Sequence, residues 1–191
     1  MTGSDSGVET FASRRMLNVL SRHECVACGE CCRWRGHVFL YAQDIKRIAR
    51  ARRQAVTAFL RESCSVVTCA SSARPHFRIA LGRKANGECA FLNGSLCSIH
   101  RIKPLMCKAG PAGWPWIGNP RFFWYYVRRS PSFKHALGTW PRSRMNHWFR
   151  RTVRAERVAQ QASSLEKLAR MCEVPVACIR KLRITDFKER S

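Results

Sequence analysis

Four cysteines lie within eight residues near the start of the chain, in the segment Cys-Val-Ala-Cys-Gly-Glu-Cys-Cys. They are Cys25, Cys28, Cys31 and Cys32. The adjacent pair, Cys31 and Cys32, cannot reach unstrained disulfide geometry with each other. Closely spaced thiolates are the soft ligands that zinc and iron–sulfur clusters require. The spacing therefore favours metal binding over a disulfide scaffold.

Adjacent cysteines raise the question of whether they serve one metal or two. Neighbouring side chains point about 100° apart on a helix and to opposite faces of a strand. We therefore expect Cys31 and Cys32 to serve different metals, or one of them to be spare.

A second group of thiols surrounds a predicted hairpin. Asn93-Gly94 lies between two apolar runs, a strong local signal for a β-hairpin. A two-residue Asn93-Gly94 turn would pair Cys97 with Ala90 and place Cys89 and Cys97 on opposite faces. A three-residue loop with Gly94 as a left-handed bulge pairs Cys89 directly with Cys97. We favour the bulge because it lets both thiols share a site.

The remaining elements are predicted to be short. Pro104 fits the first turn of a helix that carries Cys107 and stops at Gly110. Asp44 begins the first of two short helices. Strands are predicted at residues 37–41 and 76–81, and a polar loop at residues 63–75.

The motifs, taken in order, resemble a known family. Cys-x2-Cys-Gly-x-Cys-Cys-Arg, Cys-x-Phe-Leu, Cys-Ser-Ile and Pro-x2-Cys are similar to the YkgJ-type cysteine-cluster family, also called the CxxCxxCC or zinc- or iron-chelating domain. The resemblance covers about residues 22–110. It implies a metal- or Fe–S-binding module, often labelled an Fe–S oxidoreductase without established chemistry. The ligands that we predict are Cys25, Cys28, Cys31, Cys32, Cys89, Cys97 and Cys107.

Two departures from the family pattern lie beside these ligands. His100 stands where the family usually has Tyr, and Lys103 where Arg usually precedes the proline. Neither removes a predicted ligand. His100 is a candidate eighth ligand, because imidazole suits zinc, but we favour a histidine that simply occupies the Tyr position. Outside the pattern, Cys64 and Cys69 are expected to be bystander thiols in the polar loop.

The C-terminal segment, from residue 150 onward, is predicted to be helical and basic. Its pattern of apolar residues around Pro175 resembles a DNA-binding helix-turn-helix. Glu173 stands at the turn position that glycine usually occupies, because the backbone there has positive φ. We therefore favour a plain helical hairpin that packs on the domain, with Cys172 in its core.

The formal net charge of +23 is the second strong signal in the 191-residue chain. A chain this basic attracts polyanions, so nucleic acid or another anionic partner is predicted. No apolar run reaches the length of a transmembrane helix, and residues 1–13 have no apolar signal core. A reducing cytoplasm, in which the eleven cysteines stay thiols or hold metal, is the expected location.

Together these patterns predict a small α+β domain whose segments are held together by a bound metal, with short strands, a hairpin and short helices. The expected organisation is a polar lead-in at 1–21, a metal-binding domain at 22–131 with an aromatic-rich end, and a basic helical extension at 132–191. The bound cofactor is predicted to be an iron–sulfur cluster or zinc. Either the centre is redox-active, or zinc holds a basic module that binds RNA, DNA or another anion. No nucleophilic triad, phosphate loop or dinucleotide fingerprint is present, so whether the chain is an enzyme stays open.

Overall fold

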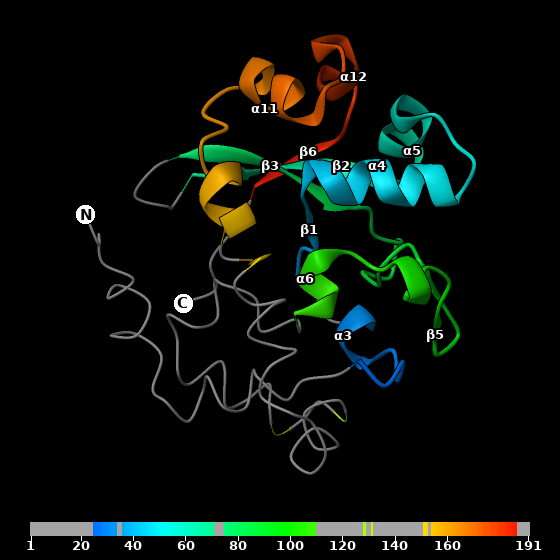
Figure 1. Cartoon of the computed structure of the whole chain (residues 1–191). Coiled ribbons are helices and arrows are strands. Elements are labelled where there is room, and N and C mark those ends of the chain that lie inside the picture. Colours follow the sequence, from blue (N-terminus) through cyan, green and yellow to red (C-terminus); the bar gives the residue numbers. More distant parts are fainter. Residues whose placement is uncertain are drawn as a thin grey trace.

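The computed structural model of the chain shows an α+β fold, as predicted (Figure 1). It describes residues 25–33, 36–70, 75–109, 128, 131, 151–152 and 154–186. The predicted lead-in at 1–21 and most of the aromatic segment 111–131 lie outside these residues. None of the helices in the described ranges combines the length and apolarity needed to cross a membrane.

A four-stranded sheet in the order β1-β3-β2-β6 forms the centre of the fold. β3 is antiparallel to both β1 and β2, whereas β6 joins β2 in parallel. Val66 of β2 is opposite Ile79 on one side and Ile184 on the other. The strands are β1 (Phe39–Leu40), β2 (Cys64–Cys69), β3 (His76–Leu81) and β6 (Ile184–Asp186).

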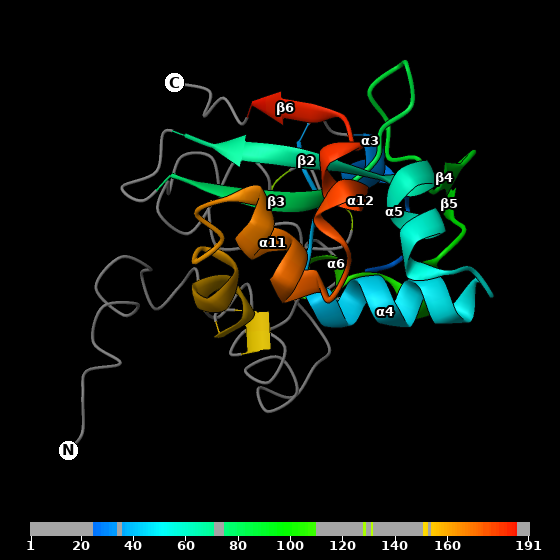
Figure 2. The same cartoon turned by 90° about the horizontal axis from the view of Figure 1, so that it is seen from above.

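Four helices build the main core with this sheet. The apolar residues between positions 45 and 60 form a stripe that divides into the two predicted short helices, because the chain turns at residues 52–55. In Figures 1 and 2, the α11–α12 pair lies across the sheet, with α4 and α5 beside it. The helices are α4 (Ala42–Ala51), α5 (Val56–Ser63), α11 (Leu165–Cys172) and α12 (Val176–Arg180).

Shorter elements gather around the end of β1. Figure 1 shows them below the sheet, on the side away from α11 and α12. α6 packs on β1, and η1 packs on α4. These elements are α3 (Glu30–Arg33), β4 (Leu92–Asn93), β5 (Leu96–Cys97), η1 (His100–Ile102) and α6 (Leu105–Lys108). They carry most of the predicted ligands.

The prediction of a polar loop at 63–75 is wrong for its first half, which forms β2. The sequence Cys-Ser-Val-Val-Thr-Cys contains three β-branched residues, and Val66 and Val67 are fully buried. Cys64 and Cys69 are therefore buried strand residues rather than loop thiols. The predicted helical C-terminal segment also contains a strand, β6, which pairs with β2 from far along the chain.

The hairpin is present, but its register differs from both predicted alternatives. Leu92 pairs with Cys97 and Asn93 with Leu96, which leaves Gly94 and Ser95 as a two-residue loop. Gly94 has φ of +58°, as expected at the first central position of a type II′ turn. Glycine occupies the position that needs positive φ, so the turn begins one residue later than a two-residue Asn-Gly turn would.

The C-terminal helices form a hairpin that packs into the main core, as we favoured. Cys172 is buried there together with Leu168 and Ile179. Glu173 ends α11 in the left-handed conformation, with φ of +56°, and its carboxylate lies 2.6 Å from Lys46 Nζ. Glu173 thus adopts the positive φ that glycine usually provides at this turn position.

Candidate metal centre

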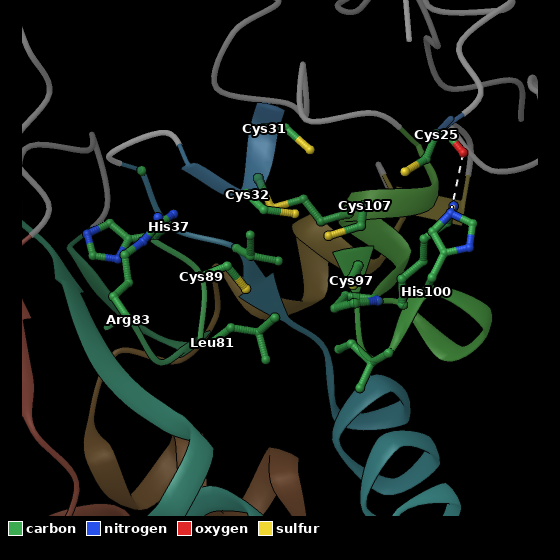
Figure 3. A pocket seen from close by; sticks show the side chains of 16 residues that line it. Cys25, Cys31, Cys32, His37, Leu81, Arg83, Cys89, Cys97, His100 and Cys107 are labelled. Carbon is green, nitrogen blue, oxygen red and sulfur yellow. Dashed lines mark hydrogen bonds between the residues drawn. The ribbon is translucent and has the colours of Figure 1, made fainter. Parts of the chain in front are cut away.

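Six of the seven predicted ligands line one cavity of 80 Å³ beneath β1 (Figure 3). Cys31 and Cys32 reach it from one side, and Cys25 and Cys107 from the other. The six are Cys25, Cys31, Cys32, Cys89, Cys97 and Cys107. Three chain segments that are distant in sequence thus deliver their thiols to one place. The seventh predicted ligand, Cys28, is half-buried and does not line the cavity.

A tight turn shapes the first segment. Ala27 and Gly29 both have left-handed backbone, with φ of +57° and +73°. A Cβ at Gly29 would lie 2.8 Å from the Ser95 carbonyl oxygen, closer than side-chain carbons approach backbone. Glycine is therefore required at this position both for conformation and for space. The turn starts α3, which carries Cys31 and Cys32.

Arg33 fastens this turn to the hairpin. Its guanidinium donates hydrogen bonds to the carbonyl oxygens of Cys28, at 3.4 Å, and Gly94, at 3.0 Å. It also lies 3.7 Å from the Glu88 carboxylate. The first cysteine segment is thus held against the second by an arginine that directly follows Cys32.

A backbone hydrogen bond joins the same segments inside the cavity wall. The Cys89 amide donates to the Cys32 carbonyl oxygen at 2.7 Å. Cys89 also forms a β-bridge with Arg83, beyond the end of β3. Through these bonds the sheet fixes the position of Cys89, and Cys89 fixes that of α3.

A buried carboxylate on α4 positions the third segment. Asp44 Oδ1 accepts a hydrogen bond from the Leu105 amide, at 3.1 Å, at the start of α6. Arg47 pairs with Asp44 at 2.6 Å and donates to the carbonyl oxygens of Ile102 and Lys103. Burial raises the pKa of Asp44, while these partners oppose the shift. The Asp44–Arg47 pair therefore anchors the chain just before Cys107.

The role of Asp44 and Arg47 was not visible in the sequence. Asp44 was recognised only as a helix-start residue. Its contact with Leu105 spans 61 residues, so no local pattern signals it.

Neighbouring thiols and burial hold protons on the cysteines in the metal-free geometry. Hydrogen bonding with Cys31 is the largest cause that raises the pKa of Cys32 to about 12, and Cys97 is a further hydrogen-bond partner. The hydrogen bond to Cys32 also raises the pKa of Cys97. Burial raises the pKa of Cys89 and that of Cys107. Metal must therefore displace protons to bind here.

Cys31 and Cys32, which we expect to serve different metals unless one of them is spare, lie at the same cavity. Their side chains face the same cavity and interact with each other. α3 is a single turn along the cavity wall. An angle of about 100° between neighbours leaves both side chains on the inner side of such a turn.

His100 also lines the cavity, at the end next to Cys25. Its Nε2 atom lies 3.3 Å from the Cys25 carbonyl oxygen and 3.2 Å from Lys103 Nζ. This nitrogen donates to the oxygen when protonated and accepts from the lysine when not. In this geometry His100 lines the cavity and contacts the backbone of the first cysteine.

The donor chemistry of the cavity fits a thiophilic metal. None of the described residues that line it is a carboxylate, and the polar lining consists of thiols, two histidines, Arg83 and Lys103. Sulfur and nitrogen donors suit zinc and iron–sulfur clusters, whereas calcium and magnesium require oxygen. In the described ranges, no three Cys, His, Asp or Glu side chains are grouped closely enough to hold a metal ion. The side chains must therefore draw inward for thiolates to share one.

The other cysteines lie away from the cavity. All cysteines in the described residues are free thiols. Cys64, Cys69 and Cys172 are buried in the cores, and Cys178 is half-buried on α12. Their placement fits bystander thiols.

A family model described as "Putative zinc- or iron-chelating domain" matches residues 24–133, more than half of the chain. The chain belongs to this CxxCxxCC family. The predicted resemblance is confirmed, and with it a zinc- or iron-chelating domain that includes all three cysteine-bearing segments. No curated protein and no solved structure matches the chain.

Gly29→Ala is expected to destabilise the metal-loaded protein by about 2 kcal/mol, because alanine is strained at positive φ and its Cβ meets the Ser95 carbonyl. Gly36→Ala is the control for stability, since a Cβ there has nothing within 4 Å, although Gly36 also lines the thiol cavity. Thermal unfolding and metal content after dialysis against a chelator measure the effect. An equal loss of thermal stability in both variants would show that the Gly29 turn has no special role.

Metal affinity is expected to fall as pH decreases from 9 to 6. The raised pKa values of Cys32, Cys89, Cys97 and Cys107 mean that the free thiols are protonated over this range. Each thiol that binds metal as a thiolate therefore releases a proton, and excess protons favour dissociation. Competition with a chromophoric chelator at several pH values gives the affinity. A pH-independent affinity would contradict thiol ligation.

Proposed function

We propose that the chain is a metal-binding protein whose thiol-lined cavity holds an iron–sulfur cluster that transfers electrons. The observation that supports this most is the convergence of six thiols from three chain segments on one cavity. Six thiols exceed the four that a cluster or a tetrahedral zinc ion uses. The predicted set, Cys28 included, therefore provides enough ligands for one cluster with thiols to spare.

The surroundings of the cavity suit a redox centre. Arg83 and Lys103 line it, and their charges would offset part of the negative charge of several thiolates. Cys25, Cys31 and Cys97 are half-buried rather than enclosed, which leaves a short route between the centre and a partner at the surface. Such a centre would function in the reducing cytoplasm, where thiols stay available for metal.

Metal and sulfide analysis, together with an anaerobic visible spectrum, tests this proposal on the full-length protein. We expect iron, labile sulfide and a brown protein. Cys107→Ser should reduce the bound iron severalfold, because Cys107 lies in the cavity wall, whereas Cys178→Ser on α12 should leave it unchanged.

The outcomes separate the metal centre from its redox role. A colourless protein that holds stoichiometric zinc would overturn the redox proposal and keep the thiol-bound metal. A protein without bound metal after expression with iron and zinc, and after anaerobic reconstitution, would overturn both.

A second candidate is a zinc-stapled basic module that binds RNA, DNA or another polyanion. The net charge of +23 and the exposed arginines of α4 and the turn after it favour this function. Arg50, Arg52 and Arg53 are all exposed there. Surface arginines of this kind contact phosphates without reading sequence.

If this candidate is correct, the protein binds mixed RNA and DNA at low salt, and log K falls linearly with log salt concentration. The double variant Arg50→Gln/Arg53→Gln should reduce the slope by about two, one for each lost phosphate contact. Arg180→Gln is the control, because Arg180 already pairs with Glu166 at 2.7 Å. Absence of binding at low salt would exclude this function.

A further inference from the structure

A second cavity, lined in part by Cys172, lies apart from the cavity of the predicted ligands, between β1, β3, α11 and the helical residues 154–159. Its volume is 420 Å³, within the range of sites that enclose small molecules. None of the predicted metal ligands lines it. The proposed metal function therefore leaves this cavity unexplained.

The lining of this cavity is apolar on most of its surface and basic elsewhere. Its polar side chains are Tyr41, Gln43, Arg78, Arg151 and Arg154. No acidic residue occurs among the described residues that line it. The apolar wall is formed by Leu40, Ile79, Ala155, Val158, Ala159, Leu168 and Met171. Val158 contributes an apolar side chain that is 52% exposed.

Arg78 is the unusual residue of the group. It is only 2% exposed, and its guanidinium stacks on Phe39, 4.4 Å from the ring centre, and near Tyr41. Nη1 pairs with Glu156, but the buried Nη2 atom has no hydrogen-bond partner among the residues that the structure describes. An unsatisfied buried donor is costly, so its retention calls for an explanation.

In this geometry Glu156 does not supply the missing acceptor, because both of its oxygens contact other donors. One of its oxygens pairs with Arg78 Nη1, and the other accepts a hydrogen bond from the Tyr41 hydroxyl at 2.8 Å. Burial raises the pKa of Tyr41, which therefore stays a neutral donor. Among the described residues at this end of the cavity, Glu156 thus engages Arg78 Nη1 and Tyr41 but leaves Arg78 Nη2 without an acceptor.

We propose that this cavity binds an amphiphilic carboxylate. The carboxylate would lie at the arginine end, where Arg151 and Arg154 add their charges to that of buried Arg78. The alkyl chain would cover the apolar wall formed by the helical residues 154–159 and α11. A neutral hydrocarbon would leave the Nη2 donor of Arg78 without an acceptor, and a small inorganic anion would leave the apolar wall exposed to water.

Decanoate is the probe, with decanol as its uncharged match, titrated into the full-length metal-loaded protein. The methyl resonance of Met171, which lines this cavity, reports binding, and that of Met106, which lines the thiol cavity, is the internal control. We expect decanoate to cause a saturable shift of the Met171 resonance and none at Met106. We expect decanol to bind at least tenfold more weakly than decanoate. Arg154→Gln should weaken decanoate binding at least tenfold. Arg157→Gln should not, because Arg157 is exposed on the same helix but does not line the cavity.

Three results would overturn the proposal. The first is an unchanged Met171 resonance at millimolar decanoate. The second is equal affinity for decanol, which would show that the arginines do not recognise the ligand. The third is an equal loss of decanoate affinity in Arg154→Gln and Arg157→Gln, which would indicate attraction to the overall charge.

Ala159→Phe tests the cavity without changing the charge. A bulky side chain in the cavity should abolish decanoate binding in a protein that remains folded.

Discussion

A hydrogen bond of 2.7 Å from the Cys89 amide to the Cys32 carbonyl joins the two halves of the cysteine cluster. Cys89 is itself fixed to the sheet through its bridge with Arg83. The first cysteine segment is only a turn and one turn of helix, too short to hold its own shape. Its position therefore depends on this bond, on Arg33 and on the close approach of Gly29 to the hairpin.

The sheet and α4 act as the rigid frame against which the thiol segments are placed. Ile45 and Ile48 bury one side of α4 in the core, and Asp44 and Arg47 use the first turns of the same helix to anchor α6. A buried ion pair contributes little net stability, but loss of one partner is costly. We infer that the pair is kept because it positions Cys107 relative to Cys32 and Cys89.

Local signals were sufficient for much of this fold. β3 occupies residues 76–81 as predicted, and α4 and α5 form where the apolar stripe breaks. The pairing of β2 with β6 joins Val66 to Ile184, and no local pattern identifies a partner so far along the chain. The hairpin register depends on where the residue with positive φ lies in the loop, and the Gly94-Ser95 loop is neither of the two alternatives that Asn93-Gly94 suggests. For the site, spacing identified the thiols, but it could not show that Cys28 stays outside the cavity or that Asp44 anchors α6.

The central claim is that thiols from all three segments bind one metal centre. X-ray absorption at the metal edge of the purified full-length protein tests this most directly, because it reports the atoms that surround the metal. The account predicts a first shell made of sulfur, at about 2.3 Å for zinc. A shell dominated by oxygen or nitrogen would contradict it.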